Sequence, residues 1–218
     1  MRDDKNISAR FEKAYSGAVF DTLRELGEPD CILPHEIKPI RQDMKMAGPV
    51  FTVRGHLEEG LDPHETLLRW TEFLSRAPSG HVVACQPNDH TIAHMGELSA
   101  ETLQLRGVKG FVADGGSRDT GFVLKIGFPV FCRYLTPRDV VGTWVPDEFE
   151  GPITIGSVTI ESGDFIFADI DGVIRIPSRL VEAVIDRVED VMGTENLVRK
   201  AILEGEDPQQ AYLNFGRF

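Results

Sequence analysis

Apolar residues recur with a helical period in three parts of the chain. Segment 64–77 predicts one helix whose apolar face carries Leu67, Leu68, Trp70, Phe73 and Leu74. Two short helices are predicted within about 7–27, because residues 17–26 follow a possible cap at Ser16 and end at Gly27. A long amphipathic helix is predicted from Ser178 and a last helix over 194–204, so that C-terminal helices extend over about 178–205.

Short apolar runs next to glycine or proline predict strands at 46–55, 81–85, 108–113 and 129–134. A helix at 97–106 separates the second strand from the third, and residues 28–49, rich in proline and polar side chains, largely predict a connecting loop. Four β-rich runs within 153–176, split by glycine turns, are typical of hairpins. This order predicts an α/β fold with right-handed crossovers and partly parallel pairing, in a single domain over 1–218.

Charge and cysteine content narrow the function classes. The formal net charge of −12 argues against a nucleic-acid partner, which needs a basic surface, and fits a soluble acidic protein. The three cysteines Cys31, Cys85 and Cys132 include no C-x-x-C pair, so we expect a reducing compartment and a cytoplasmic protein. Cys85 and Cys132 lie in apolar stretches that predict buried thiols. No secretory leader or membrane-spanning stretch is expected in the sequence.

The most informative pattern is an acid, Glu97, followed after twenty residues by the pair Arg118-Asp119. Between them the chain closes a helix at Gly107 and crosses an apolar strand, so the pair follows the strand's carboxyl end, where open α/β sheets bind ligands. A guanidinium beside a carboxylate suits an anion held against a metal, although a surface ion pair gives the same dipeptide. Gly96 lets the free amides of the next helix approach an anion closely.

Other motifs carry weaker signals. His90 and His94 are four residues apart and could share a helical face as metal ligands, but the glutamate of H-E-x-x-H is missing, and His94 alternatively lines a pocket. Residues 169–172 resemble a fragment of a calcium loop and are better explained as a turn between strands. Residues 110–116 lack the spacing of a nucleotide-binding loop, and Ser117 has no assigned histidine partner, so a serine hydrolase is unsupported.

Taken together, these residues resemble those of the superfamily of 4-hydroxy-4-methyl-2-oxoglutarate aldolases and regulator of ribonuclease activity A (RraA). The resemblance covers nearly the whole chain and rests on Ser16–Leu23 with Leu26–Gly27, Gly96–Leu98, Arg106–Gly110, Asp114–Gly115 with Arg118–Asp119, Pro129–Phe131, and Gly163–Asp164 with Ala168–Val173. It implies a swivelling-type α/β/β sandwich with a mixed central sheet. It further implies homotrimers or homohexamers with sites at subunit boundaries, and a divalent metal, Mg²⁺ or Mn²⁺.

The same resemblance implies roles for individual residues. Asp119 would bind the metal, Arg118 would hold a keto oxygen as it becomes an enolate, and Glu97 would shuttle a proton through water on the metal. The backbone from Gly96 through Leu98 and Ser99 would receive the carboxylate of a 2-keto acid substrate. These roles describe a metal-dependent pyruvate aldolase or oxaloacetate decarboxylase, because both reactions pass through a pyruvate enolate.

Further residues and other functions stay open. His94 is a tentative neighbour of the site, and Glu195 is a weak candidate to complete it from the last helices of another subunit. Relative to many aldolases, the chain has Glu at position 97 in place of Asp, and residues 63–66 in place of an Asp-Asn pair, so the substrate stays open. The alternative is a non-catalytic regulator that binds and inhibits a ribonuclease. No glycine-rich adenosylmethionine pattern follows the first strand, which argues against a methyltransferase.

Overall fold

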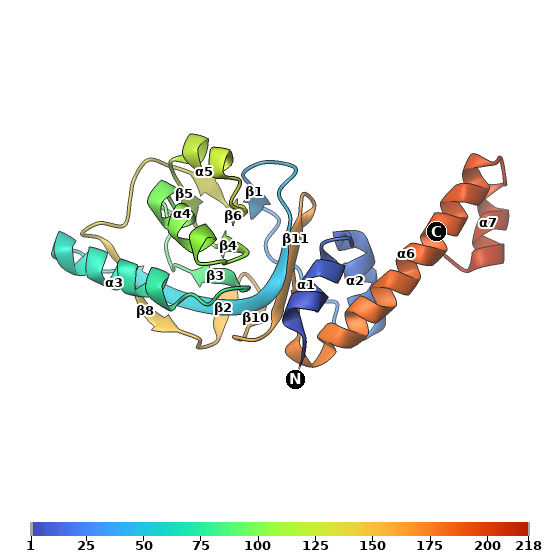
Figure 1. The fold of residues 1–218 in the computed structure, drawn as a ribbon, viewed down its shortest axis with the longest axis horizontal. Helices are drawn as coiled ribbons and strands as arrows, with labels where there is room; N and C mark the ends of the chain where they lie inside the picture. The colour runs from blue at the N-terminus through green and yellow to red at the C-terminus, as the bar shows by residue number, and fades with distance from the viewer. Residues whose placement is uncertain (1, 218) are drawn as a thin grey trace.

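The computed structural model describes residues 2–217 and is built on one large mixed sheet (Figure 1). Its order is β1-β6-β4-β3-β2-β11-β12, with β8 paired to the end of β2. The parallel centre consists of β2 (Met46–Leu57), β3 (Val82–Gln86), β4 (Gly110–Ala113) and β6 (Val130–Cys132). Antiparallel strands flank it: β1 (Lys38–Pro39), β8 (Trp144–Phe149), β11 (Phe165–Asp169) and β12 (Gly172–Ile176). The predicted α/β class is confirmed.

Three apolar clusters fill the spaces between sheet and helices. Alternate side chains of β2 point to opposite faces of the sheet. Val50 therefore belongs to an inner cluster, which it shares with β9 (Ile153–Ile155) and β10 (Val158–Ile160), whereas Phe51 belongs to an outer cluster on the other face. The outer cluster packs under α3 (Pro63–Arg76), α4 (Glu97–Leu105) and α5 (Thr120–Ile126). A third cluster lies between β11–β12 and the helices α1 (Asp4–Phe11), α2 (Ser16–Glu25) and α6 (Val181–Leu203).

Shorter elements complete the description. Strands β5 (Gly116–Ser117) and β7 (Tyr134–Leu135) form a parallel pair, and β9 and β10 form the expected hairpin. A 3₁₀ turn at Ser178–Leu180 precedes α6, and α7 (Pro208–Phe215) follows it. The two last helices extend away from the sheet (Figure 1). None of the helices within 2–217 combines the length and apolar character needed to cross a membrane.

The C-terminal prediction is wrong in one respect. The two helices expected within 178–205 form the single helix α6, which continues through Gly193 and ends before Gly205. An interior glycine costs a helix only about 1 kcal/mol relative to alanine, and the buried valines along α6 outweigh that cost. Helix α7 was not predicted; its N-terminus is capped by Asp207, whose side chain accepts hydrogen bonds from two backbone amides.

Two other expectations need correction. Ser16 does not cap α2: it is the first helical residue, and its amide donates to Oδ2 of Asp169 at 2.9 Å. The carboxylate of Asp169, the last residue of β11 before the predicted turn into β12, therefore replaces the missing local cap. On α3, Leu67 and Leu68 are 46% and 51% exposed, although their spacing predicted burial with Trp70. The apolar face of α3 is wider than the surface that the sheet covers.

Candidate functional site

Two loops that follow neighbouring parallel strands lie side by side and form the site. The loop after β3 makes a parallel bridge at Ala93 with Gly116, the first residue of β5 in the segment that follows β4. The amide of His94 donates to the Gly116 carbonyl, and the amide of Arg118 donates to the Met95 carbonyl, each at 2.8 Å. These backbone bonds place residues 96–97 beside 118–119, at the carboxyl edge of the sheet.

Asp119 adopts a left-handed backbone conformation, with φ of 53° and ψ of 31°, at the start of α5. Aspartate tolerates this region better than most side chains, and here the conformation turns the carboxylate toward α4. Its Oδ2 accepts a hydrogen bond from the amide of Glu97 at 3.2 Å and lies 3.4 Å from Nε of Arg118. Within residues 2–217, Oδ1 accepts no hydrogen bond, so this oxygen is free to bind a cation.

Gly96 is required by close packing rather than by its backbone angles, which are extended. A Cβ added to it would lie 2.7 Å from Oδ2 of Asp119 and 3.2 Å from Nε of Arg118. Any side chain here would therefore push the Arg-Asp pair out of place. The next two amides, of Leu98 and Ser99, have no hydrogen-bond partner within 2–217, while that of Glu97 is occupied by Asp119.

Asp139 is a neighbour that the sequence did not indicate. Its Oδ2 accepts from Nη1 of Arg118 at 3.0 Å, and its Oδ1 accepts from the amide of Val141 at 3.2 Å. The guanidinium thus lies between Asp119 and Asp139, which fixes its orientation and leaves Nη2 without a partner among the described residues. Nothing in the sequence around Asp139 differs from an ordinary polar turn.

These groups border a cavity of about 470 Å³. Glu97, Arg118 and Asp119 line it together with apolar residues of α3, among them Leu67 and Leu74. Trp70 of α3 also lines it, and its Nε1 donates to Oγ of Ser99 at 2.9 Å. The predicted residues Gly96, Leu98 and His94 also line the cavity, whereas Glu195 lies on α6 and does not.

The carboxylates of Asp119 and Glu97 suit a hard divalent cation such as Mg²⁺ or Mn²⁺. Residues 2–217 contain no group of three or more His, Cys, Asp or Glu side chains that could hold a metal ion. Because Mg²⁺ commonly keeps several waters and binds one or two protein carboxylates, the donor set still fits such an ion. Asp119, with its free Oδ1, and Glu97 are the residues that would hold it.

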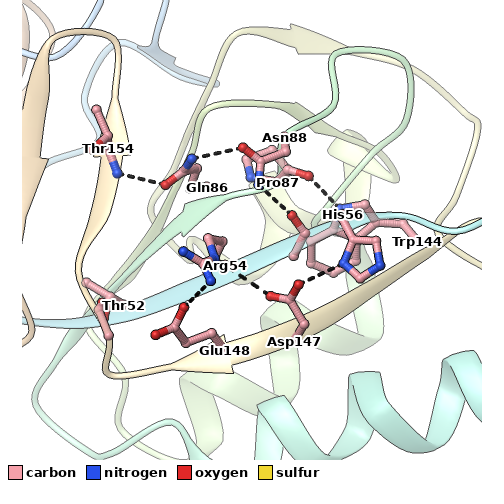
Figure 2. A network of polar contacts seen from close by, with 12 residues as sticks. Thr52, Arg54, His56, Gln86, Pro87, Asn88, Trp144, Asp147, Glu148 and Thr154 are labelled. Carbon is pink, nitrogen blue, oxygen red and sulfur yellow. Dashed lines mark hydrogen bonds and ion pairs between the residues drawn. The ribbon is translucent and has the colours of Figure 1, made fainter.

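Figure 2 shows a polar network that includes Trp144, whose ring packs against two residues that line the cavity, Trp70 and His94. Nε1 of Trp144 donates to the Pro87 carbonyl at 2.7 Å, and the Trp144 ring packs edge-on against Trp70. A Cβ on Gly55 would lie 2.1 Å from the Trp144 ring, so β2 needs glycine at this point. Nδ2 of Asn88 donates to the Gly55 carbonyl at 2.8 Å, which ties the loop after β3 to the same strand.

The structure does not bring His90 and His94 together as metal ligands, and His94 lines the cavity, the alternative that the sequence left open. Residues 90–94 do not form a helix, and the side chain of His90 is 57% exposed whereas that of His94 is fully buried. The His94 ring packs against Trp144, and its Nε2 lies 3.7 Å from Oδ2 of Asp89. Neither ring nitrogen has a hydrogen-bond partner within 2–217. Burial lowers the pKa of His94 to about 4, so the ring is neutral at pH 7.

We expect His94 to make stability depend on pH. The unfolded chain binds a proton at this residue below about pH 6.5 and the folded chain only near pH 4, so stability falls as the pH falls through this window. The contribution of this one group is on the order of 3 kcal/mol. Urea unfolding at pH 7 and pH 4.5 should show a smaller loss for His94→Gln than for the unmodified protein. Equal losses in both proteins would contradict this expectation.

The buried nucleophile candidates are structural. Cys31, Cys85 and Cys132 are buried, as predicted for the last two, and burial raises the pKa of Cys132 to about 12. Such thiols are protonated at neutral pH and unreactive. The Ser117 hydroxyl is buried and donates to the Met95 carbonyl at 3.3 Å, where it supports the loop that carries Gly96.

A family model described as RraA-like, Aldolase/RraA, matches residues 16–175, which include every residue that lines the cavity. The chain belongs to the RraA-like family. This family includes both 4-hydroxy-4-methyl-2-oxoglutarate aldolases and non-catalytic ribonuclease inhibitors, so membership alone does not assign an activity.

Two curated relatives of this RraA-like chain differ in how much of their own length it covers. Protein DlpA of Legionella pneumophila is 27% identical over 211 residues, which cover 94% of this chain and 33% of DlpA. The chain therefore spans about a third of the length of DlpA. A protein of Halalkalibacterium halodurans, named "Putative 4-hydroxy-4-methyl-2-oxoglutarate aldolase", is 28% identical over 181 residues, which cover 83% of both chains.

Solved structures support the RraA-like fold. A structure described as novel cellulases from microbes of the gut ecosystem is 34% identical, with a TM-score of 0.83 over 89% of this chain and 87% of its own. An uncharacterized protein of Pseudomonas syringae has a TM-score of 0.87 at 24% identity, covering 99% of this chain and 96% of its own. RraAS2 of Streptomyces coelicolor is described as an unusual member of the RNase ES inhibitor RraA protein family. It has a TM-score of 0.80 at 23% identity, covering 91% of this chain and 99% of its own. The last two show the fold alone.

Proposed function

We propose that this RraA-like protein is a divalent-metal-dependent lyase that cleaves a carbon–carbon bond next to a 2-keto acid and forms a pyruvate enolate. The observation that carries the proposal is the contact of Asp119 with both Arg118 and the Glu97 amide. This contact lies at a cavity beside Gly96, where any side chain would collide with the Arg-Asp pair. A structural ion pair alone would not need the unbonded Oδ1 of Asp119 or the free amides beside it.

The residues of the chain divide the work in this proposal. The amides of Leu98 and Ser99 bind the carboxylate of the 2-keto acid, supported by the dipole of α4. Nη2 of Arg118 donates to the keto oxygen, whose negative charge grows as the bond breaks. Asp139 keeps the guanidinium in place at 3.0 Å. Glu97, in the first turn of α4, moves the proton of the substrate hydroxyl.

A divalent cation held by Asp119 would supply Lewis-acid stabilisation of the enolate charge. Retro-aldol cleavage and oxaloacetate decarboxylation both produce this enolate, which is protonated at C3 to give pyruvate. The proposal therefore covers both reactions. We further propose that the protein acts as a homo-oligomer, in which Glu195 of α6, remote from the cavity of its own chain, serves the site of a second copy.

We expect pyruvate release from 4-hydroxy-4-methyl-2-oxoglutarate or oxaloacetate to require Mg²⁺ or Mn²⁺. A coupled lactate dehydrogenase assay measures it, with spontaneous decay of each substrate subtracted. EDTA should lower the rate by about a hundredfold or more, because the enolate loses its strongest electrostatic partner. A full rate in EDTA would contradict the metal dependence, and no release from either substrate would contradict the proposal.

The second candidate is a regulator that binds a ribonuclease, and the net charge of −12 favours it because an acidic surface suits a basic partner segment. Its test is a pull-down with ribonuclease E. Tight binding that is unaffected by Asp119→Asn, together with no pyruvate release, would favour the regulator. Such a function gives no role to the contact between Glu97 and Asp119, and we therefore prefer the enzyme.

A further inference from the structure

Among residues 2–217, three hydroxyl side chains line the cavity: Thr71 on α3, and Ser99 and Thr102 on α4. Oγ1 of Thr71 donates to the Leu67 carbonyl at 2.8 Å, and Oγ1 of Thr102 donates to the Leu98 carbonyl at 2.7 Å. Both protons are therefore used within their own helices, a common arrangement for hydroxyl side chains on a helix. Ser99 differs from both threonines.

The hydroxyl of Ser99 accepts a hydrogen bond instead of donating within α4. Its Oγ lies 2.9 Å from Nε1 of Trp70, a group that can only donate. The two carbonyls that Ser99 could reach within its helix, those of Met95 and Gly96, already accept backbone amides at 2.8 and 2.9 Å. Within residues 2–217, the Ser99 proton has no acceptor, and the residue is only partly buried.

Packing fixes the indole that makes this contact. Trp70 is buried, and its ring lies edge-on against Phe73 and Trp144, with ring centroids 5.1 and 5.9 Å apart. The Nε1–H group therefore points in one direction, toward Ser99. Because this donor occupies one side of the Ser99 oxygen, the hydroxyl proton must point away from Trp70. A hydroxyl that accepts one hydrogen bond also donates the next one more strongly.

We infer that the side-chain hydroxyl of Ser99, oriented by Trp70, donates a hydrogen bond to the carboxylate of the 2-oxo acid. The inference rests on the proposed function, since it concerns the substrate of the same site. A carboxylate only accepts hydrogen bonds and so matches a hydroxyl whose proton is the part left free. Ser99 would thus bind the substrate through its side chain as well as its amide, whereas Trp70 acts through Ser99 and is a positioning residue.

The Ser99→Ala variant should bind pyruvate about tenfold more weakly, because a hydrogen bond to a charged group is stronger than one between neutral groups. Calorimetry with Mg²⁺ present measures this affinity. In the coupled assay we expect KM to rise about tenfold and kcat to change less than about threefold, since the carboxylate is bound alike before and during bond cleavage. Ser99→Thr keeps the hydroxyl and should restore both Kd and KM.

The matched control is Thr102→Val, which removes a hydroxyl that lines the same cavity from the same helix. Because the Thr102 proton is already used by the Leu98 carbonyl, we expect the Kd of pyruvate to stay within about twofold of the unmodified value. Thermal unfolding checks that each variant folds. An equal loss of affinity in Thr102→Val and Ser99→Ala would overturn the inference, since the polarity of the cavity alone would explain both.

A double-mutant cycle tests whether Trp70 acts through Ser99. Trp70→Phe removes the Nε1 donor and keeps an aromatic ring, and alone it should weaken pyruvate binding about threefold, because the Ser99 hydroxyl is free to turn. Combined with Ser99→Ala, it should cause no further loss, since the hydroxyl that it orients is already absent. Losses that multiply in the double variant would mean that Trp70 supports the cavity by packing alone and would overturn its positioning role.

The outcomes separate the inference from the proposed function. Weaker pyruvate binding by Ser99→Ala, with no pyruvate release from either substrate by the unmodified protein, would support the Ser99 contact and contradict the lyase. Pyruvate release with unchanged Kd and KM in Ser99→Ala would support the lyase and overturn the inference; a second copy of the chain that takes up the Ser99 proton would give this result. Failure of the unmodified protein to bind pyruvate would also overturn the inference.

Discussion

The Asp119→Asn variant should lose pyruvate release almost completely, with kcat/KM lowered about a thousandfold, or on the order of 4 kcal/mol. Asparagine keeps the size of the side chain and tolerates the left-handed backbone at φ 53°, and its oxygen can still accept from the Glu97 amide. The change therefore removes the charge that would hold a cation and leaves the local geometry. The coupled assay at saturating Mg²⁺ measures the effect.

A matched carboxylate elsewhere controls for the loss of one charge. Asp147 on β8 pairs with His56 at 2.7 Å and lies outside the cavity, so Asp147→Asn should retain the pyruvate release of the unmodified protein. Thermal unfolding of both variants checks that each folds. If Asp119→Asn kept more than about a tenth of the rate, the carboxylate would not carry the electrostatic role assigned to it.

The Gly96→Ala variant should fold normally and lose about a hundredfold in kcat/KM. Its backbone is extended, which alanine adopts freely, so stability should change little. The new methyl group would lie 2.7 Å from Oδ2 of Asp119 and must displace the carboxylate, the Arg118 side chain, or both. Because small displacements of positioning groups strongly reduce rates, activity should fall while the fold persists.

Gly121 offers a control a few residues away. It lies in α5, two residues after Asp119, and a Cβ added there has no neighbour within 4 Å. Gly121→Ala should keep full activity and gain about 0.5–1 kcal/mol in unfolding free energy from the added helix propensity. Activity lost equally in both variants would mean that rigidity of the 118–121 segment, rather than space at Gly96, limits the reaction.

The central strands could be predicted because they are buried on both faces and therefore form short continuous apolar runs. Helix α5 could not, since its seven residues are too few to establish a helical period. Strand β8 contains Pro146 and two acidic residues, which sequence patterns exclude from central strands and which an edge position accepts. The continuous α6 shows that packing outweighs one glycine signal at Gly193.

The proximity of Glu97 to Arg118 and Asp119 was predictable, because both segments follow the carboxyl ends of adjacent parallel strands. Asp139 was not, since it reaches Arg118 through a loop whose path depends on tertiary pairing of β5 with β7. The exposed position of Leu67 was missed for a related reason. A helical period shows which residues share a face, but it does not show how far a neighbouring layer covers that face.

The amide of Ser16 is bound by Asp169, and α1 and α2 pack on α6, so the first helices depend on the last third of the chain. On the ribosome, residues 4–25 emerge long before their partners exist. At typical elongation rates, synthesis from residue 25 to residue 188 takes roughly 10–30 s. Throughout that time the apolar side of both helices, including Phe11 and Leu23, has no native surface to cover it. We therefore expect the unfinished chain to expose this apolar side, which is the kind of surface that chaperones acting early in translation bind.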